Sequence, residues 1–257
     1  MLAALNRILV LTGSGISAES GIPTFRGPEG YWRNFDPTKL ATEAAFVRDP
    51  VTVWEWYRER RERIARSSPN AAHVALVELA AATNEFLLVT QNVDDLHGRA
   101  EWNGRQLDPA QIVQIHGDIF ATRCSSCDFR RRNPAADVGE VPKCPVCGAS
   151  LRPDVVWFDE ELDPGKVSTV QTFLAKGDCD FVFVIGTTAV FSYITEWALA
   201  GRGANGRLIE INPDETALSP LADERMRAPA GTIAGTLVEK LIDRPQVGGL
   251  LTDIAPF

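Results

Sequence analysis

The stretch ILVLTGSGISAESGIPTFRG, residues 8–27, decides the fold of the chain. Residues 8–11 are apolar and predict a short buried strand. Gly13, Gly15 and Ala18 follow in a G-x-G-x-x-A spacing, which lets a backbone turn sharply at a strand end and point amides at a pyrophosphate. By itself this spacing is a weak signal of a dinucleotide site, because a strand-to-helix turn that binds no nucleotide explains it about as well.

The residues after this loop argue against an oxidoreductase that transfers hydride. Such an enzyme continues with a helix, a second strand and an acidic residue about 20 positions further on. Here the chain runs instead through Pro23, Phe25 and Arg26 into a segment rich in glycine and aromatic residues. We interpret this segment as a mobile flap over a binding site.

Length and composition indicate one large α/β domain or one domain with a smaller insert. The chain has 257 residues, of which 45% are apolar and 23% charged, as is typical of a globular protein with a sizeable core. No apolar run approaches the roughly 18 residues of a membrane span, and no secretion signal precedes the first strand, so we expect a cytoplasmic protein. The net charge of −8 argues against nonspecific nucleic-acid binding and is compatible with cationic, lysine-bearing partners.

Predicted strands alternate with predicted helices along the rest of the chain. Apolar runs predict strands at 86–90, 112–115, 181–185 and 208–211, and helical patterns lie near 51–66, after Asn70, and near 164–176, 192–200 and 232–242. This alternation predicts a parallel sheet with helices on both faces, which binds ligands beyond the carboxyl ends of its strands. Glycines or polar residues follow five strands, and we expect them to share one crevice: Gly13, Gln91, Asn92, Asp94, His116, Gly186, Thr187 and Asn212.

Two Cys-x-x-Cys pairs, separated by 16 residues, predict a zinc site. The pairs are Cys124 with Cys127 and Cys144 with Cys147. Four thiolates close a tetrahedral shell, so the metal would be structural. Disulfides are the alternative, disfavoured in a reducing cytoplasm. A nucleic-acid module is another, with Arg123 and residues 130–132 as its basic patch, although the acidity of the whole chain weighs against it.

The chain has three histidines, and one of them suits catalysis. His73 falls within a helical pattern and His97 at a helix start, so we interpret both as packing or capping residues. His116 ends an apolar strand and precedes Gly117, where the backbone must turn into the crevice. A histidine there can serve as a general base, because imidazole titrates near neutral pH.

Taken together, these motifs resemble the sirtuins, the NAD-dependent protein lysine deacylases. The resemblance covers nearly the whole chain and implies a Rossmann-like domain of residues 1–34, 67–118 and 153–257. It also implies an inserted small domain of residues 35–66 and 119–152, made of a helical segment and a zinc ribbon. Besides the cysteine quartet, the motifs are TGSGISAESGIPTFRG (12–27), TQNVDDLH (90–97), IHGDIF (115–120), LRPDVVWFDE (151–160), GTTAVF (186–191) and IEINPDET (209–216).

The resemblance implies that NAD is consumed as a co-substrate and that one structural zinc ion is bound. His116, Asn92 and Asp94 would be the catalytic residues, with His116 taking a proton through the ribose hydroxyls after nicotinamide leaves. Ile22 and Asp94 would hold the nicotinamide carboxamide, and Phe25 would cover the reacting ribose. The other implied NAD contacts are Gly13, Ser14, Gly15, Ala18, Glu19, Pro23, Arg26, Gln91, Gly186, Thr187, Thr188, Asn212, Pro213, Asp214 and, in the turn before the last helix, Ile233.

The partners implied are proteins bearing acyl-lysine. The peptide would lie as a strand between residues 156–159, including Val156, Trp157 and Phe158, and residues 189–191. Tyr57 and Arg60 lie three apart, on one helix face, and match the sirtuin subclass that removes succinyl and malonyl groups, as does the small Ala41. From periodicity alone, a solvated basic stripe is the better interpretation of this helix.

The chain departs from the usual sirtuin pattern at Ser14, Asp154 and Asp159. Asp159 would flank the peptide and could favour cationic peptides. Two other functions use the same motifs: a protein ADP-ribosyltransferase, or an NAD-sensing domain that carries a zinc-ribbon binding module. Intact His116, Tyr57 and Arg60 favour deacylation over ADP-ribosyl transfer. Intact Gln91, Asn92, Asp94 and His116 disfavour the NAD-sensing domain.

Overall fold

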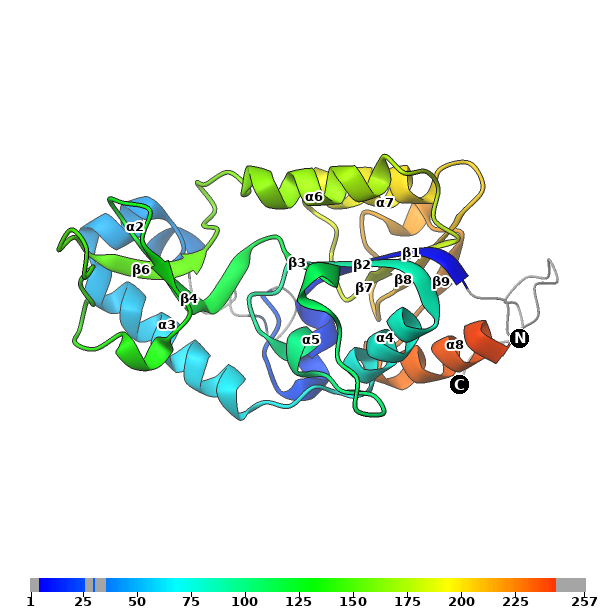
Figure 1. Cartoon of the computed structure of the whole chain (residues 1–257), viewed down its shortest axis with the longest axis horizontal. Coiled ribbons are helices and arrows are strands. Elements are labelled where there is room, and N and C mark those ends of the chain that lie inside the picture. The colour runs from blue at the N-terminus through cyan, green and yellow to red at the C-terminus, as the bar shows by residue number, and fades with distance from the viewer. Residues whose placement is uncertain (1–4, 26–29, 31–35, 244–257) are drawn as a thin grey trace.

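The computed structural model describes residues 5–25, 30 and 36–243. Figure 1 shows a large lobe built on a six-stranded sheet beside a smaller lobe built on a three-stranded sheet. The proposed flap, Arg26 included, lies mostly outside the described residues. Among the described residues, no helix is long and apolar enough to cross a membrane.

The large sheet is wholly parallel, as the alternation of elements predicts. Its strand order is β3-β2-β1-β7-β8-β9. The chain winds outward from β1 in one direction through β2 and then in the other through β7, so β1 and β7 flank the switch point where such sheets bind ligands. The strands are β1 Leu5–Thr12, β2 Thr83–Thr90, β3 Ile112–Gln114, β7 Phe181–Ile185, β8 Arg207–Ile211 and β9 Glu224–Met226.

Helices bury both faces of this sheet. Ile8 and Val10 of β1 join one apolar core, and Leu9 and Leu11 join the other, because successive side chains of a strand point to opposite faces. Figure 1 shows α4 (Ala71–Ala81) and α8 (Ala230–Asp243) below the sheet, with α6 (Pro164–Leu174) and α7 (Ser192–Arg202) above it.

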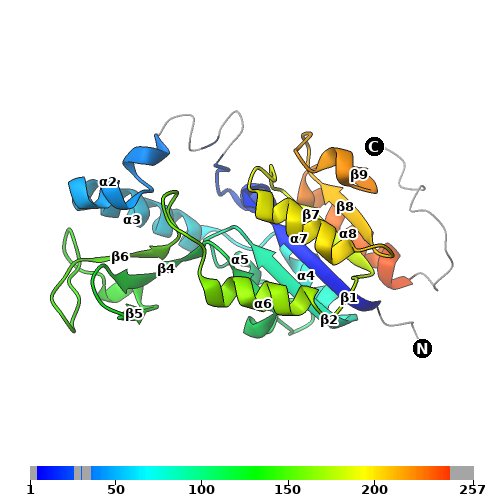
Figure 2. The same ribbon diagram turned by 90° about the horizontal axis from the view of Figure 1, so that it is seen from above.

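The small lobe combines two segments that are distant in sequence. Its sheet is antiparallel, in the order β5-β4-β6, with β4 Gly117–Cys124, β5 Arg130–Arg131 and β6 Leu151–Val155. Helices α2 (Glu43–Arg48) and α3 (Pro50–Arg66) share a core with this sheet. Trp54 of α3 is fully buried there, and its Nε1 donates to the Leu151 carbonyl at 2.9 Å. Figure 2 shows this lobe at the opposite end from β8 and β9.

Local side chains explain where α2, α3 and α4 begin. Thr42, Asp49 and Asn70 each accept a hydrogen bond from a first-turn amide of α2, α3 or α4, as N-cap residues do, and the predicted Asn70 cap is confirmed. The sequence did not predict β4, β9 or the 3-10 helix η1 (Ser14–Ser20). The remaining short elements are η2 Pro37–Lys39, α5 Leu96–Arg99, η3 Pro109–Gln111, η4 Pro134–Ala136 and η5 Ser219–Leu221.

Candidate active site

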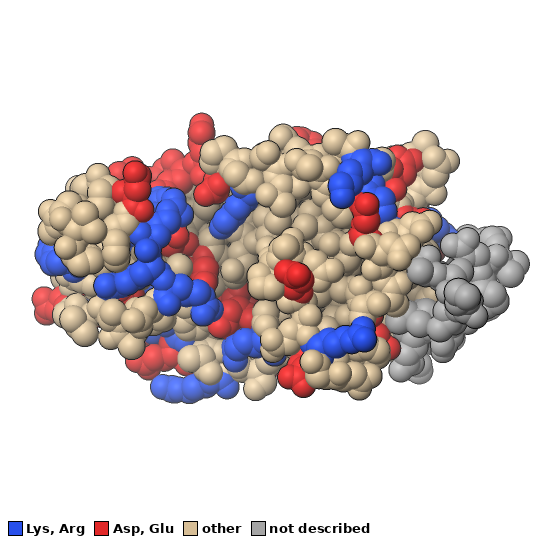
Figure 3. Space-filling view, in the orientation of Figure 1, with Lys and Arg blue, Asp and Glu red and all other residues tan. Residues whose placement is uncertain are grey.

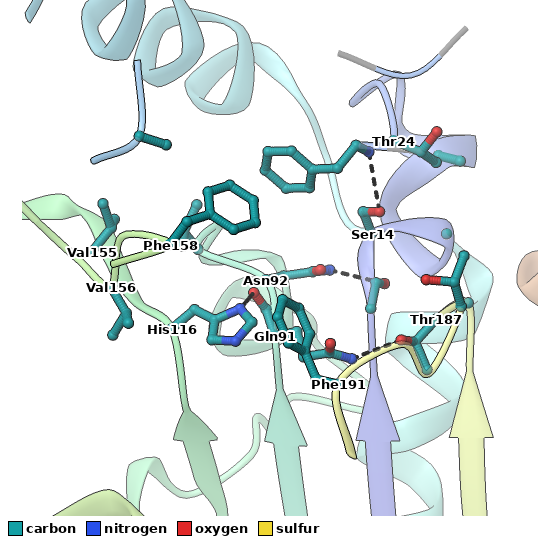
Figure 4. Close-up of a pocket in the computed structure, with 18 of the residues that line it drawn as sticks. Ser14, Thr24, Gln91, Asn92, His116, Val155, Val156, Phe158, Thr187 and Phe191 are labelled. Carbon is teal, nitrogen blue, oxygen red and sulfur yellow. Dashed lines mark hydrogen bonds between the residues drawn. The ribbon is translucent and has the colours of Figure 1, made fainter. Parts of the chain in front are cut away.

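A cavity of about 640 Å³ lies at the carboxyl ends of the large sheet and extends to the small lobe. Figure 4 shows side chains from the loops after β1, β2, β3 and β7 converging on it. Most of the predicted site residues line it: Gly13, Ser14, Gly15, Ala18, Glu19, Phe25, Ala41, Tyr57, Arg60, Gln91, Asn92, His116, Val156, Trp157, Phe158, Gly186, Thr187, Thr188, Asn212, Pro213 and Asp214.

Three glycines let the first loop pack directly on the turn after β7. A Cβ on Gly13 would stand 2.7 Å from Thr187 Cβ, and one on Gly15 would stand 2.7 Å from Gly186 Cα. Gly186 has a φ of +61°, in the left-handed region that favours glycine. The glycines are therefore required because two backbones meet there.

The amides of Gly13 and Gly15 are themselves bonded within the chain, while the predicted contact of the amides near these residues with a pyrophosphate stays a prediction. Gly13 N donates to the Ile185 carbonyl at 3.0 Å, and Gly15 N donates to the Gly186 carbonyl at 2.8 Å. Both amides are used to join the two loops. The Ser14 hydroxyl, which accepts from the Phe25 amide at 3.4 Å, remains among the polar groups of the loop that line the cavity (Figure 4).

Gln91 and Asn92, which follow β2, tie the neighbouring loops together. Asn92 Nδ2 donates to the Gly13 carbonyl at 3.2 Å and to Ser17 Oγ at 3.1 Å. Gln91 Nε2 donates to Thr187 Oγ1 at 2.8 Å, a bond drawn in Figure 4. The floor of the cavity is thus a network of buried amides and hydroxyls, which holds polar groups in fixed directions.

Asp94 lies behind this floor and does not line the cavity. Its side chain is buried, accepts from Ser17 Oγ at 3.0 Å and accepts from the Leu96 amide at 3.1 Å. Burial raises the pKa of Asp94 to about 6. Ile22 and Pro23 are also absent from the cavity lining. The roles of Ile22 and Asp94 in holding nicotinamide, and of Pro23 as an NAD contact, stay predictions.

The expected place of Ile233 is wrong. The last helix begins at Ala230, so Ile233 lies in its first turn and not in the preceding loop. It packs against the core between the sheet and α4 and does not line the cavity.

His116 lies between the two sheets, after β3 and immediately before β4. Its Nδ1 is 3.0 Å from the Gln91 carbonyl, which can only accept a hydrogen bond, so Nδ1 carries a proton. The imidazole points into the cavity in Figure 4. In the neutral ring Nε2 is then the basic atom, the arrangement that a general base needs.

Tyr57 and Arg60 form the end of the cavity in the small lobe, together with Trp157. Tyr57 Oη accepts from Trp157 Nε1 at 3.0 Å, and burial raises the pKa of Tyr57. The Arg60 guanidinium lies 4.5 Å from the Trp56 ring centroid and 5.0 Å from that of Phe25. With 6% of its surface exposed, Arg60 is a buried cation inside a cavity and not part of a solvated stripe.

The loop after β6 is bonded to its surroundings through consecutive amides. Val156 N donates to the His116 carbonyl at 2.9 Å, Trp157 N to Glu160 Oε2 at 2.9 Å, and Phe158 N to the Ala41 carbonyl at 3.0 Å. The pairing of a peptide with this loop stays a prediction.

Asp154 and Asp159, which depart from the sirtuin pattern, both have partners within the chain. Asp159 accepts from the amide of Glu43, at the start of α2, at 3.1 and 3.0 Å. Asp154 pairs with Arg130 of β5 at 3.1 Å. Both carboxylates thus stabilise the small lobe.

The four cysteines cluster as a metal site requires. All four Sγ atoms lie within 4.8 Å of one another, with Cys124 and Cys147 at 3.4 Å and Cys127 and Cys144 at 3.7 Å. Tetrahedral zinc with thiolate bonds near 2.3 Å needs sulfur atoms about 3.8 Å apart, so the cluster fits one structural zinc ion.

The arginines of the zinc ribbon are paired with carboxylates. Arg131 pairs with Asp137 at 2.6 Å, and Arg132 pairs with Asp118 at 2.6 Å and Asp95 at 3.2 Å. Figure 3 shows acidic side chains among the basic ones over this lobe. The predicted basic patch is thus largely neutralised, which argues against nucleic-acid binding there.

The structure places His73 and His97 as packing and capping residues. His73 Nδ1 lies 3.0 Å from Asn70 Oδ1 in the cap of α4, and His97 Nε2 lies 3.1 Å from Thr12 Oγ1 at the end of β1. The two buried rings contact each other, with centroids 4.8 Å apart. Burial lowers the pKa of both, to about 4 for His73.

The fold and the cavity define a Rossmann-like α/β protein with a ligand cavity at the carboxyl ends of its parallel strands. The chain belongs to the Sir2 family, whose sequence model matches residues 13–192. It is 42% identical to an NAD-dependent protein deacylase of Pyrococcus furiosus, over 94% of this chain and 95% of that protein. It is 41% identical to NAD-dependent protein deacylase 1 of Archaeoglobus fulgidus, over 90% and 91%.

Solved structures show the same architecture. A Sir2 homologue in complex with NAD is 40% identical, with a TM-score of 0.80 over 91% of this chain and 89% of that one. A Sir2 homologue mutant in complex with ADP-ribose is 39% identical, with a TM-score of 0.83 over 93% and 95%.

Sequence reasoning missed two residues that shape the cavity. Tyr193, in the first turn of α7, has its Oη 2.5 Å from His116 Nε2. Glu160 accepts from Arg123, Arg152 and the Trp157 amide, which fixes the loop after β6. The acidic residue of the LRPDVVWFDE motif was a visible signal for Glu160, whereas the sequence near Tyr193 gave none.

Proposed function

We propose that the chain is an NAD-dependent protein-lysine deacylase whose acyl pocket prefers succinyl and malonyl over acetyl groups. One observation supports the whole proposal: a single cavity joins the glycine loop, His116 and the buried Tyr57 and Arg60. A nucleotide at the glycine loop would therefore meet an acyl chain that enters from the small lobe.

NAD fits the residues that line the large-lobe part of the cavity. The volume of about 640 Å³ lies within the range of ligand pockets. The loop of Gly13–Gly15 packs on Gly186 and leaves the hydroxyls of Ser14 and Thr187 and the side chain of Asn212 at the cavity wall. NAD would supply the anomeric carbon to which the acyl oxygen of an acyl-lysine bonds as nicotinamide leaves.

The protein's own residues would bind the reactants and move protons. Asn92 and Gln91 fix the turn of Gly13 and Thr187, which positions the nucleotide. His116, held as the Nδ1-protonated tautomer by the Gln91 carbonyl, accepts a proton at Nε2 from the ribose. Phe25 and the neighbouring aromatic side chains exclude water from the reacting groups.

The preference for acidic acyl chains follows from the charge at the end of the cavity. A carboxylate that enters the pocket could form charge-assisted hydrogen bonds with the guanidinium of the buried Arg60, and such bonds are strong where water is excluded. The Tyr57 hydroxyl accepts from Trp157, so its own proton can be donated to the same carboxylate. Ala41, as a small side chain, leaves room for the longer acyl group.

The test compares kcat/KM on succinyl- and acetyl-lysine forms of one peptide, with the products identified by mass spectrometry. A charge-assisted hydrogen bond contributes about 1.5–3 kcal/mol, so Arg60→Met should lower kcat/KM for the succinyl peptide roughly 10- to 150-fold. Activity on the acetyl peptide should change little. Arg63→Met, on the half-exposed side of the same helix, is the matched control.

Two results would contradict the proposal at different levels. Equal kcat/KM on both peptides, unaffected by Arg60→Met, would remove the acidic-acyl preference and leave a plain deacetylase. Transfer of labelled ADP-ribose to protein, without deacylation of any peptide, would identify an ADP-ribosyltransferase instead.

A further inference from the structure

The phenol of Tyr193 is held against the catalytic histidine by aromatic packing. Its ring stacks on Phe191 with centroids 5.6 Å apart and an interplanar angle of 17°, and it contacts Trp197 at 5.0 Å. The Tyr193 ring meets the His116 ring edge-on, at 88°. This packing fixes the hydroxyl beside the imidazole.

The hydroxyl is the donor in its bond to His116. Nδ1 of His116 donates to the Gln91 carbonyl at 3.0 Å, so Nε2 of the neutral ring is an acceptor. Tyr193 Oη lies 2.5 Å from Nε2. Burial raises the pKa of Tyr193 well above its usual value, so the phenol keeps its proton at neutral pH.

This bond creates a conflict with the proposed role of His116. The lone pair of Nε2, which has to accept the ribose proton, already receives the hydrogen bond of Tyr193. Both side chains line the same cavity. The ribose hydroxyl must therefore displace the phenol or act through it.

We propose, building on the deacylase function above, that Tyr193 is a proton relay between the ribose of NAD and His116. As a ribose hydroxyl gives its proton to Tyr193 Oη, the phenolic proton passes to His116 Nε2. One O–H bond breaks at the ribose and one forms at the tyrosine, while the tyrosine's original O–H bond is replaced by an N–H bond. The tyrosine ends neutral, the histidine gains one positive charge and the ribose oxygen becomes the nucleophile.

The other titratable groups around the cavity already have partners or lie at its far end. Glu19 accepts from the Gly231 amide, and Glu160 is paired with Arg152. Tyr57 and Arg60 lie on α3 in the small lobe, and Asp214 lies after β8. Tyr193 is the titratable side chain that the described structure places in hydrogen-bond contact with His116 Nε2.

The kinetic test uses Tyr193→Phe, which removes the hydroxyl and keeps the stacked ring. General acid–base catalysis contributes about 10²- to 10⁴-fold, and water can replace part of it, so kcat for deacylation should fall about 10- to 100-fold. The KM for NAD should stay within about threefold of the wild-type value. The rate of nicotinamide exchange, a step that precedes the proton transfer, should do so as well. The dependence of kcat on the D₂O fraction should change from curved, with two protons in flight, to linear.

Trp197→Phe is the matched control, since it disturbs the same aromatic stack and leaves the hydroxyl in place. A wild-type kcat in Tyr193→Phe would overturn the relay, and a raised kcat would show that the phenol blocks the base. In both cases the proposed deacylase function would still hold, provided that the His116→Ala variant is inactive. Absence of deacylation by the wild-type protein would instead remove that function.

A second measurement needs neither NAD nor turnover. The chain has three histidines, so ¹⁵N-labelled imidazole signals can be assigned with single variants. The Nε2 resonance of neutral His116 should move toward that of an unbonded imidazole nitrogen in Tyr193→Phe. An unchanged resonance would show that the bond does not form in solution and would overturn the relay.

Discussion

The buried pair His73 and His97 should make the protein lose stability as the pH falls from 7 to 5. Burial, and then Arg99, lowers the pKa of His73 to about 4, and burial lowers the pKa of His97 well below its ordinary value. Among the described residues, His73 Nε2 and His97 Nδ1 have no hydrogen-bond partner. Neither ring can therefore take up a proton at pH 5 without unfolding its surroundings.

The magnitude follows from linkage between protonation and folding. In the unfolded chain both histidines titrate near pH 6.5, so below that pH the unfolded state binds protons that the folded state does not. Each histidine then lowers the free energy of unfolding by about 1.4 kcal/mol per pH unit, or roughly 4 kcal/mol for the pair at pH 5.

Asp94 acts in the opposite direction. Its folded pKa of about 6 lies above the ordinary value for aspartate, so the folded state takes up a proton first as the pH falls. This uptake raises the free energy of unfolding by about 1.4 kcal/mol at pH 5. The net expected loss between pH 7 and pH 5 is therefore about 2–3 kcal/mol.

Urea unfolding at pH 7, 6 and 5, followed by tryptophan fluorescence and circular dichroism, measures this loss. His73→Gln and His97→Gln should each reduce the dependence on pH by about 1.4 kcal/mol per unit below pH 6.5, whatever their effect on stability at pH 7. A slope equal to that of the wild-type protein in both variants would refute the reasoning. A rise in stability toward pH 5 would refute it as well.

Two further predictions concern the zinc site and the glycine loop. A zinc chelator should release one metal ion per chain, measured with a colorimetric zinc indicator. Its removal should loosen the small-lobe core that contains Cys124 and Cys144, so that tryptophan side chains become exposed and the selectivity for succinyl-lysine falls. Release of the metal without a change in tryptophan fluorescence would contradict the structural role. Gly15→Ala should weaken NAD binding in calorimetry and cost about 1–3 kcal/mol of stability, because its Cβ would lie 2.7 Å from the Gly186 backbone. Gly98→Ala, where a Cβ meets nothing within 4 Å, is the control, and equal behaviour of the two variants would sink the steric explanation.

Much of the large lobe could be predicted because its strands are short, apolar and separated by helical patterns. Parallel strands buried on both faces read as continuous apolar runs, as residues 8–11 and 181–185 do. The small lobe was harder: β4 alternates buried and half-buried positions and contains charges, so its eight residues carry no apolar run. Helix α8 could be predicted from its helical pattern, whereas the placing of Ile233 in a turn came from the family resemblance and not from that pattern.

The candidate site could be predicted as a set of residues but not as a set of bonds. Strand ends place Gln91, Asn92 and His116 at one edge of the sheet, and that follows from topology alone. The spacing of Gly13 and Gly15 signals a close approach to the backbone, yet it does not say whether a phosphate or another loop approaches. In this chain the residues at the end of β7 approach the loop, and the carbonyls of Ile185 and Gly186 accept hydrogen bonds from the amides of Gly13 and Gly15.

The departure from the sirtuin pattern at Asp159 joins the loop after β6 to the start of α2. Asp159 binds the first amide of α2, and the neighbouring Phe158 amide binds the Ala41 carbonyl, so two consecutive residues of the loop after β6 hold the segment that carries Ala41. A glycine at position 159 would keep the second bond and lose the first. Under the proposed function, in which Ala41 lines the acyl pocket and the loop after β6 holds the peptide, these two bonds would tie the choice of acyl group to the binding of the peptide.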